Sequence, residues 1–170
     1  TSGPGLDARA RKSGRHFGCA IKSSQIAKDP DFTAAVLREA GVIVEEYELK
    51  RHVTQAKPGK YDFSGADKLI DFAQKHGLGA RGHTLVWYAA NPPWLEAALP
   101  GASPRDREDL LGGYIETAMR RYAGRITEWD VVNEPVEPNQ GRRDGMRAKN
   151  IWEQAFGDRY IDIAFQIARE

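Results

Sequence analysis

Cysteine is almost absent from this chain, because only Cys19 among its 170 residues carries a thiol. A single cysteine excludes an intrachain disulfide and a cysteine-rich zinc site. Cys19 lies in the apolar run of residues 17–21, which predicts a small buried core residue rather than a reactive thiol. The four histidines show no ligand spacing, and no Gly-rich phosphate loop follows a predicted strand. We therefore expect neither a metal nor a cofactor.

Net charge is nearly absent as well, since 25 lysines and arginines balance 24 acidic residues to leave +1. This balance gives no electrostatic footprint for nucleic acid or for an anionic membrane surface. No apolar stretch reaches the length that spans a bilayer. A Gly-x-Ser-x-Gly nucleophile elbow and an internal repeat are also missing. We therefore expect no nucleic-acid partner and no membrane partner.

What the sequence does contain is an alternation of strand-like and helix-like segments. Residues 1–14 are rich in Gly, Ser and charge, which predicts a flexible N-terminal segment, and residues 15–170 follow as one domain. Ser64 and Ser103 are the predicted N-caps of two helices. Strands are expected over residues 16–21, 42–46, 80–87 and 126–134, and helices over 32–40, 64–76, 104–123, 150–156 and 158–170. This alternation indicates an α/β fold with a parallel sheet under helical cover.

The most informative segment is Thr-Glu-Trp-Asp-Val-Val-Asn-Glu-Pro at residues 127–135. Its apolar residues favour a strand covered on both faces, and Pro135 ends that strand. Glu134 then stands at the C-terminal end of a parallel strand, where barrel enzymes hold their chemistry. A charge directly after near-apolar strand residues is costly unless it is exposed or partnered. We therefore predict that Glu134 is a general acid or base and that Asn133 hydrogen-bonds substrate beside it.

Two other predicted strand ends gather polar and aromatic side chains. The residues are Glu45, Glu46, Tyr47, Glu48 and Lys50 after one strand, and His83, Trp87 and Tyr88 on and after the next. Carboxylates and aromatic rings that converge on one cleft suit sugar recognition. Each also has a simpler interpretation. The simpler interpretations are a hydrogen-bonded core position for His83, a solvated run of charge for the glutamates, a surface ion pair between Lys50 and Glu46, and packing for Trp87 and Trp94.

These motifs resemble those of glycoside hydrolase family 10, the (β/α)8-barrel endo-β-1,4-xylanases. The resemblance is carried by Arg-Gly-His-Thr-Leu-Val-Trp at residues 81–87, Trp-Asp-Val-Val-Asn-Glu at 129–134 and Tyr-Asp-Phe-Ser-Gly-Ala-Asp at 61–67. Glu-Tyr-Glu-Leu-Lys at 46–50 is similar to the family's Glu-Asn-Glu-Met-Lys. The resemblance extends from about residue 15 to the last residue. It implies a TIM barrel of which this chain covers about the first four βα units.

The resemblance also implies a role for each matching residue. Glu134 would be the general acid/base of a retaining hydrolase, and Asn133 would bind the 2-hydroxyl of the sugar at the cleavage point. The resemblance implies that the same sugar is also contacted by His83, Lys50 and Trp87. It implies that Glu46 contacts the next sugar on the non-reducing side. The implied substrate is xylan or a xylooligosaccharide, and the implied location is extracellular or periplasmic.

Four positions depart from the family pattern. Tyr47 stands where the family has Asn, Arg51 where it has Trp, Tyr88 where it usually has His, and Ala90 where a Gln contacts sugar. We expect Tyr47 and Tyr88 to bind substrate in a rebuilt neighbouring subsite. A rebuilt subsite favours a substituted or differently linked glycan over plain xylan.

A retaining mechanism needs a second carboxylate about 5–5.5 Å from the first. The family carries this nucleophile on its seventh strand, whereas four strands are predicted here. Glu128 lies about 20 Å from Glu134 along the same strand, too far to serve. We therefore expect the nucleophile outside this chain, on the remaining C-terminal half of the barrel. Two other interpretations stay open: a non-catalytic half-barrel that binds glycan or assembles with a partner half, and a cellulase-like barrel of the Asn-Glu-Pro group.

Overall fold

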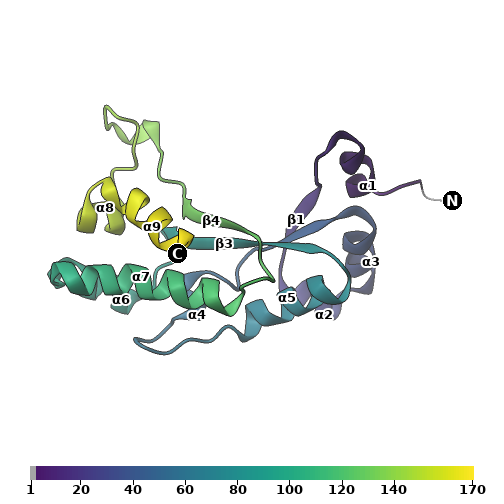
Figure 1. The fold of residues 1–170 in the computed structure, drawn as a ribbon, viewed down its shortest axis with the longest axis horizontal. Coiled ribbons are helices and arrows are strands. Elements are labelled where there is room, and N and C mark those ends of the chain that lie inside the picture. Colours follow the sequence, from purple (N-terminus) through teal and green to yellow (C-terminus); the bar gives the residue numbers. More distant parts are fainter. Residues whose placement is uncertain (1–2) are drawn as a thin grey trace. The chain divides into compact units, whose positions relative to one another are not determined.

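The computed structural model describes residues 3–170 (Figure 1). The strands are β1 (Gly18–Ile21), β2 (Val42–Glu45), β3 (Gly79–Trp87) and β4 (Glu128–Asn133). The longer helices are α3 (Pro30–Glu39), α5 (Ser64–Lys75), α7 (Pro104–Arg121) and α9 (Arg159–Arg169). The shorter helices are α1 (Leu6–Ala10), α2 (Ser23–Lys28), α4 (Arg51–Thr54), α6 (Pro93–Ala98) and α8 (Ile151–Phe156), with 3-10 turns η1 (Arg11–Ser13), η2 (Leu99–Gly101) and η3 (Pro138–Gln140).

The four strands form one sheet in the order β1-β2-β3-β4. Gly18 of β1 pairs with Val42 of β2 in parallel, and Val42 pairs in parallel with Gly79 of β3. The chain passes through helices between successive strands, which is the crossover that parallel neighbours require. The structure thus confirms the predicted alternation of strands and helices around a parallel sheet.

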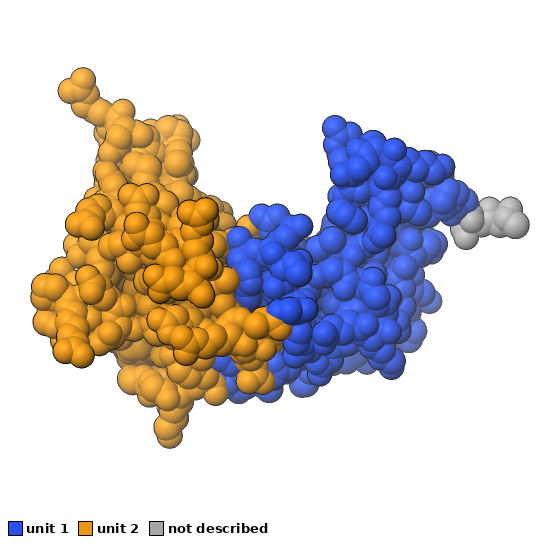
Figure 2. Space-filling model, viewed as in Figure 1, with its two compact units in different colours: residues 1–49, 62–83, 124–129 blue, residues 50–61, 84–123, 130–170 orange. Residues whose placement is uncertain are grey.

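The chain divides into two compact units (Figure 2). The first comprises the described part of Thr1–Leu49 with Asp62–His83 and Gly124–Trp129, and the second comprises Lys50–Tyr61, Thr84–Ala123 and Asp130–Glu170. Strands β3 and β4 begin in the first unit and end in the second. The predicted site residues are divided accordingly. The first unit contains Glu46, Tyr47 and His83, and the second contains Lys50, Trp87, Tyr88, Asn133 and Glu134.

Helix α5 supplies much of the core of the first unit because its apolar residues recur every three or four positions. Its buried residues are Ala66, Leu69, Ile70 and Ala73. Ile21 of β1 and Ile43 of β2 are fully buried in the same unit. This core depends on aliphatic side chains of the helix and the sheet.

Gly82 of β3 is required by close packing in the first unit. The six-membered ring of Trp129 occupies the space that a Cβ at position 82 would need. Glycine is therefore the residue that lets the indole approach the strand. The contact with Trp129 explains why glycine stands at position 82, whatever the role of the neighbouring His83.

Helix α1 is the main difference from the prediction in the N-terminal region. We predicted a flexible segment over residues 1–14, of which residues 1 and 2 lie outside the described residues, and residues 6–13 form α1 and η1. The Asp7 carboxylate organises this region. It accepts hydrogen bonds from the backbone N–H of Phe17 at 3.0 Å and from Nε of Arg11 at 2.6 Å. It also occupies the space where a Cβ at Gly41 would lie, so a glycine is needed there.

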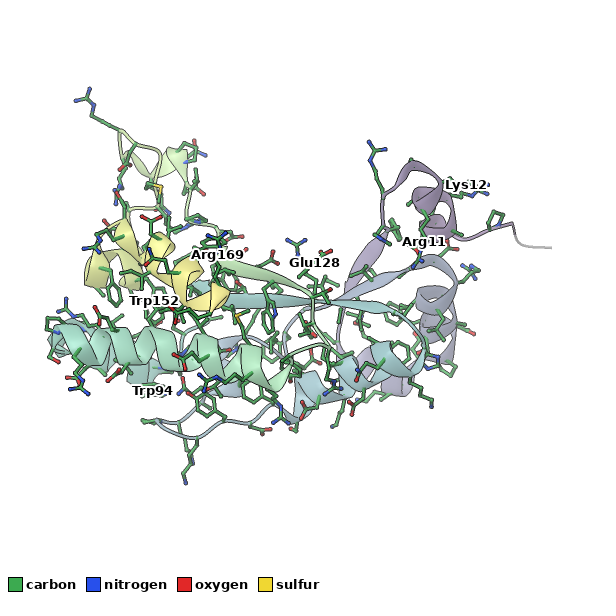
Figure 3. All side chains as sticks on the ribbon, in the orientation of Figure 1. Arg11, Lys12, Trp94, Glu128, Trp152 and Arg169 are labelled. Carbon is green, nitrogen blue, oxygen red and sulfur yellow. The ribbon has the colours of Figure 1, made fainter. Side chains whose placement is uncertain are left out.

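Helix α7 supplies much of the core of the second unit. Oγ of Ser103 accepts a hydrogen bond from the N–H of Asp106 at 3.2 Å, which confirms the predicted N-cap. The buried residues of α7 are Leu111, Gly112, Tyr114, Ile115 and Ala118. Trp152 of α8 and Tyr160 of α9 are buried in the same unit, and Figure 3 marks Trp152.

Three smaller predictions are corrected. Ser64 is the first residue of α5 rather than its cap, since Phe63 holds the N-cap position and the Asp62 carboxylate accepts from the Ser64 N–H at 2.9 Å. Val131 is the single buried residue of β4, which was predicted to be covered on both faces. The reason is that β4 is an edge strand within residues 3–170. Cys19 is half-buried rather than buried, and it lies on the other edge strand, β1.

Candidate active site

Glu134 follows the last residue of β4 with a backbone conformation that is unusual for a residue with a side chain. Its φ is 50°, in the left-handed region, and Pro135 follows it directly. This conformation costs about 1–2 kcal/mol for residues other than glycine. Within residues 3–170, Ala90 is the only other non-glycine residue with positive φ. Strained backbone of this kind gathers at functional sites, so the structure singles out Glu134 independently of the sequence motif.

The carboxylate of Glu134 is held by Trp87, the last residue of β3. The indole Nε1 donates a hydrogen bond to Oε2 of Glu134 at 3.0 Å, and the Glu134 side chain is 49% exposed. Nζ of Lys50 lies 4.9 Å from the centroid of the Trp87 ring, within cation–π range. Asn133 is half-buried at the end of β4. The second unit thus brings Lys50, Trp87 and Glu134 together, although they come from distant parts of the sequence.

The backbone at Trp87 is fixed by two side-chain donors. Nε1 of Trp152 donates to the Trp87 carbonyl oxygen at 3.0 Å, and Nδ2 of Asn91 donates to the same oxygen at 2.9 Å. Trp152 is fully buried in α8. The indole that bonds Glu134 is therefore tied to the core of the second unit.

Arg147 is a site residue that the sequence did not reveal. Its Nε donates to the carbonyl oxygen of Glu134 at 3.0 Å, and its backbone N–H donates to the carbonyl oxygen of Pro135 at 2.9 Å. Its Nη2 lies 3.9 Å from Oε2 of Glu134 and 3.6 Å from Oε2 of Glu137. The guanidinium carbon lies 3.8 Å from the centroid of the Tyr88 ring. No periodicity marks a contact residue in a polar loop, so the sequence offered no signal beyond the presence of a cation.

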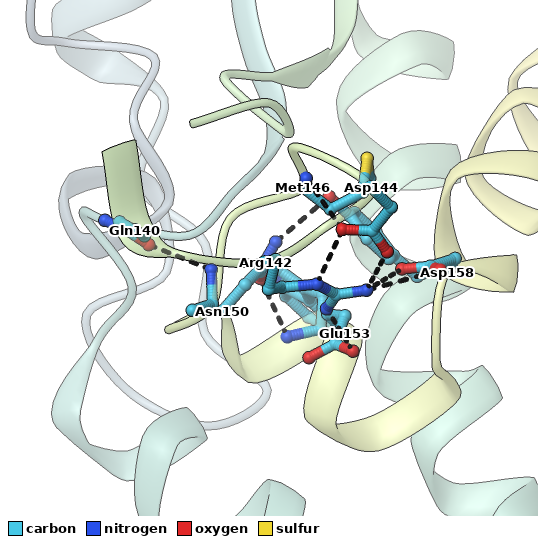
Figure 4. Close-up of polar contacts among 10 residues, drawn as sticks. Gln140, Arg142, Asp144, Met146, Asn150, Glu153 and Asp158 are labelled. Atoms are coloured by element: carbon cyan, nitrogen blue, oxygen red, sulfur yellow. Dashed lines mark hydrogen bonds and ion pairs between the residues drawn. The ribbon is translucent and has the colours of Figure 1, made fainter. Parts of the chain in front are cut away.

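The loop between β4 and α8 is fixed by a second arginine, Arg142 (Figure 4). Its guanidinium forms ion pairs with Asp144 at 2.6 Å, Glu153 at 2.7 Å and Asp158 at 3.3 Å. The hydrogen bond from Arg142 holds the pKa of Asp144 at about 2. The loop that carries Arg147 is therefore tied by ion pairs of Arg142 to Glu153 of α8 and to Asp158.

Arg51, which stands where the family pattern has Trp, is buried in the second unit. Its guanidinium carbon lies 4.5 Å from the ring centroid of Tyr114, 5.4 Å from that of Trp152 and 6.0 Å from that of Trp94. Figure 3 marks the two tryptophans. Nε donates to Oε1 of Gln55 at 2.9 Å. Burial lowers the pKa of Arg51 to about 10. This substitution therefore changes packing among aromatic rings, not a surface that a sugar reaches.

In the first unit, the end of β2 carries two different kinds of glutamate. Glu46 is exposed and pairs with Nζ of Lys22 at 3.1 Å. Glu45 is fully buried, and within residues 3–170 neither of its carboxyl oxygens has a hydrogen-bond partner. Burial raises the pKa of Glu45 to about 8, and the nearby Glu48 adds a smaller increase. The interpretation of this run as solvated charge fits Glu46 but is wrong for Glu45 and for Glu48, which is also buried.

Tyr47 and His83 are the other predicted residues of the first unit. The Tyr47 residue is 48% exposed, and His83 is half-buried on β3. Glu128 begins β4 and pairs with Arg81 at 3.6 Å, and Figure 3 marks its position. Glu134 follows the last residue of the same strand. Glu128 and Glu134 thus lie at opposite ends of β4.

Two kinds of feature are absent from residues 3–170. No group of three or more His, Cys, Asp and Glu side chains is arranged to hold a metal ion. In the same part of the chain, no helix combines the length and the apolar character needed to cross a membrane.

The fold and the residues at the strand ends define a class of protein. Parallel strands alternate with helices, and a carboxylate with aromatic neighbours stands at the C-terminal end of β4. In barrels of parallel strands, this end of the sheet is where catalytic residues lie. Carboxyl groups act on the glycosidic bond in glycoside hydrolases, and aromatic side chains commonly line ligand pockets. The class indicated is therefore a barrel-type glycoside hydrolase.

The comparisons with known proteins agree with this class. The sequence profile of Glycosyl hydrolase family 10 matches residues 5–170. Endo-1,4-beta-xylanase 2 of Claviceps purpurea is 32% identical over 169 residues, which are 97% of this chain and 48% of that protein. Endo-1,4-beta-xylanase B of Paenibacillus barcinonensis is 31% identical over 169 residues, 98% of this chain and 49% of that protein. This chain belongs to glycosyl hydrolase family 10.

Solved structures give the same result for the fold. A psychrophilic glycoside hydrolase family 10 endo-beta-1,4-xylanase matches with a TM-score of 0.86 at 30% identity, over 98% of this chain and 52% of its own. A xylanase from Paenibacillus barcinonensis, solved with a conduramine derivative, matches with a TM-score of 0.85 at 29% identity, over 99% and 50%. The chain spans about half the length of the two curated relatives named above. The predicted fold, part of a (β/α)8 barrel, is confirmed.

Proposed function

We propose that this chain provides the acid/base half of a retaining glycoside hydrolase that cleaves β-1,4-xylosidic bonds in xylan or a related decorated glycan. The observation that carries the proposal is Glu134, which follows β4 in a left-handed conformation with its carboxylate bonded to the indole of Trp87. The named relatives are endo-1,4-beta-xylanases, which supports xylan as the substrate.

In this mechanism Glu134 acts twice. As a general acid it donates a proton to the glycosidic oxygen while the bond to the leaving sugar breaks. It then acts as a general base and removes a proton from the water that attacks the glycosyl-enzyme intermediate. The hydrogen bond from Trp87 supports this role because it fixes one carboxylate oxygen while 49% of the side chain stays exposed to solvent.

The nucleophile is proposed to come from outside this chain, on the remaining C-terminal half of the barrel. A retaining enzyme needs that carboxylate about 5–5.5 Å from Glu134. The two named curated relatives are about twice as long as this chain, which supports a further half as the source. The partners of the chain are then this other half and a xylan-type glycan.

The sugar at the cleavage point is proposed to contact residues from three strand ends. Asn133 would donate to its 2-hydroxyl, and the other residues proposed to bind it are His83, Lys50 and Trp87. Glu46 would contact the next sugar on the non-reducing side, and the exposed ring of Tyr47 offers a face for stacking on a pyranose. Because xylan is a polymer of cell walls, we propose an extracellular or periplasmic location.

Hydrolysis of xylooligosaccharides by the protein that carries this chain tests the proposal. Glu134→Ala should lower kcat/KM on xylooligosaccharides about 10²–10⁴-fold. It should have much less effect on aryl xylosides whose leaving group needs no proton. Equal losses on both substrate types would refute the acid role. An NMR time course should show the β-anomer as the first product, and an α-anomer would refute retention.

Two measurements separate the alternatives. A purified protein with the mass of these 170 residues that binds xylan without turnover would favour a non-catalytic half-barrel, and about twice that mass would favour a complete enzyme. Turnover of cellooligosaccharides with no action on xylooligosaccharides would favour the cellulase-like barrel.

A further inference from the structure

We propose that Arg147 and Tyr88 form a positioning pair for Glu134, an inference that rests on the proposed acid/base role. Four residues of the second unit, Trp87, Tyr88, Glu134 and Arg147, contact one another in turn. Trp87 donates to Glu134 at 3.0 Å and meets the Tyr88 ring edge-on, with centroids 5.7 Å apart and ring planes at 81°. The Arg147 guanidinium carbon lies 3.8 Å from the centroid of the Tyr88 ring, and Arg147 Nε donates to the backbone carbonyl oxygen of Glu134 at 3.0 Å.

Arg147 holds the backbone on both sides of the Glu134–Pro135 peptide step. Its Nε binds the carbonyl oxygen of Glu134, and its own N–H binds the carbonyl oxygen of Pro135. A hydrogen bond from a charged donor is stronger than one between neutral groups. These two contacts oppose the steric cost of the left-handed conformation at Glu134, whose φ is 50°. Arg147 therefore fixes the direction in which the Glu134 side chain leaves the strand.

The burial of Arg147 distinguishes it from a surface ion-pair partner. Its side chain is 9% exposed, so its charge is largely removed from water. Two carboxylates compensate this charge through Nη2, with Glu134 at 3.9 Å and Glu137 at 3.6 Å. A buried cation with several fixed partners keeps one orientation, whereas exposed pairs contribute little. The guanidinium is therefore rigid enough to position a neighbour.

Tyr88 has a different role in this arrangement from the one its place in the sequence predicted. One face of its ring is occupied by the Arg147 guanidinium. That face is not available to a sugar, and a phenol ring provides a good surface for a cation. The tyrosine that stands where the family usually has His thus acts on the acid/base through Arg147, as a support for the guanidinium.

The decisive test compares two substrates of the protein that carries this chain. kcat/KM is measured on xylotetraose, whose leaving sugar needs a proton, and on dinitrophenyl β-xylobioside, whose leaving group does not. For a retaining enzyme this ratio reports the first chemical step, so the substrates differ in their need for the acid. Arg147→Met should lower the value about tenfold to a hundredfold on xylotetraose and less than about threefold on the aryl glycoside.

Two further variants examine the pair itself. Arg147→Lys should restore part of the loss on xylotetraose, because an ammonium group still lies over the Tyr88 ring and donates to the Glu134 carbonyl. Tyr88→Ala should show the same substrate pattern with a smaller loss. The double variant should lose little more than Arg147→Met alone, since both changes act on one contact. Fully additive losses would contradict the pairing.

Arg142→Met is the matched control, because it removes a guanidinium from the same loop whose ion pairs are with Asp144, Glu153 and Asp158. It should change both substrates by the same factor. If Arg147→Met also changed both equally, its role would be structural and the inference would be wrong. If Glu134→Ala failed to distinguish the substrates, the proposed function itself would be wrong.

A crystal structure of the Arg147→Met variant gives a second readout that does not depend on turnover. We expect Glu134 to lose its positive φ or its hydrogen bond from Trp87. A variant that keeps both features would overturn the positioning role.

Discussion

Glu45 in the first unit and Glu134 in the second are both glutamates at the C-terminal end of a parallel strand, and their surroundings differ sharply. Glu45 is fully buried, and its two carboxyl oxygens have no hydrogen-bond partner within residues 3–170. Glu134 has a side chain that is 49% exposed, a donor in Trp87 and a cation in Arg147. Burial raises the pKa of Glu45 to about 8, so at neutral pH it is largely a neutral acid.

The difference lies in how each residue leaves its strand. Glu45 is still part of β2, and alternation places its side chain on the same face as Ile43, which is fully buried. Glu134 lies one residue beyond β4 and turns through a left-handed conformation, so strand alternation no longer sets its direction. A carboxylate at a strand end becomes available for chemistry when the backbone has already left the strand.

The largest effect should come from replacing each carboxyl group by an amide of the same shape. Glu134→Gln should lower kcat/KM on xylotetraose about 10²–10⁴-fold, because an amide cannot donate the proton that the proposed acid role requires. Glu45→Gln should leave the selectivity between xylotetraose and dinitrophenyl β-xylobioside as it is in the wild type. Steady-state kinetics on both substrates checks this. A loss confined to xylotetraose in Glu45→Gln would remove the contrast between the two glutamates.

The next effect concerns the pH dependence of stability. Because the folded-state pKa of Glu45 is raised from 4.5 to about 8, its contribution to stability is full below about pH 4.5 and is lost as the pH rises towards 8. At about 1.4 kcal/mol per pKa unit, the loss is on the order of a few kcal/mol. Urea unfolding across this range should show a slope that Glu45→Gln removes and Glu46→Gln keeps. An unchanged slope in Glu45→Gln would show that the buried glutamate is not its cause.

Gly82→Ala tests the close packing of the Trp129 ring against β3 in the first unit. A methyl group at this position meets the ring of Trp129, so the free energy of unfolding should fall by about 1–3 kcal/mol. Gly113→Ala is the control, since a Cβ there meets no atom within 4 Å in helix α7. That substitution should raise stability by up to about 1 kcal/mol. Urea midpoints measure both, and equal shifts would argue against the clash at Gly82.

The smallest effect is expected for Glu137→Gln in the second unit. The Glu137 side chain is 30% exposed and shares Nη2 of Arg147 with Glu134. Loss of one partly exposed ion pair should lower kcat/KM on xylotetraose by no more than about threefold. The same two-substrate assay detects it. A tenfold or larger loss would place Glu137 in the catalytic machinery and weaken the simple contrast drawn above.

Sequence patterns predicted those parts of the molecule that local physics determines. Apolar periodicity and the cap at Ser103 gave the strands and the long helices, and the strand ends gave Lys50, Trp87 and Glu134, which lie together in the second unit. Arg147 was missed because its contacts join a polar loop to strand ends that are distant in sequence. No local pattern encodes such contacts.

Two other features had signals of different strength. The buried position of Glu45 follows from two-residue alternation with Ile43, but the neighbouring glutamates made the run look solvated. Helix α1 had no comparable signal, since it depends on the Asp7 carboxylate reaching Phe17 and the space beside Gly41. Composition alone predicted flexibility there because it contains no information about such specific contacts.

The left-handed backbone at Glu134 places stability and activity in opposition at one position. Glycine adopts a φ of 50° without the steric cost that a glutamate side chain bears, and asparagine tolerates it better than most residues. A variant library screened only for heat resistance would therefore be expected to collect glycine or asparagine at position 134 and to lose the proposed proton donor. Directed evolution of this chain for thermal tolerance should keep this glutamate fixed and seek its gains elsewhere.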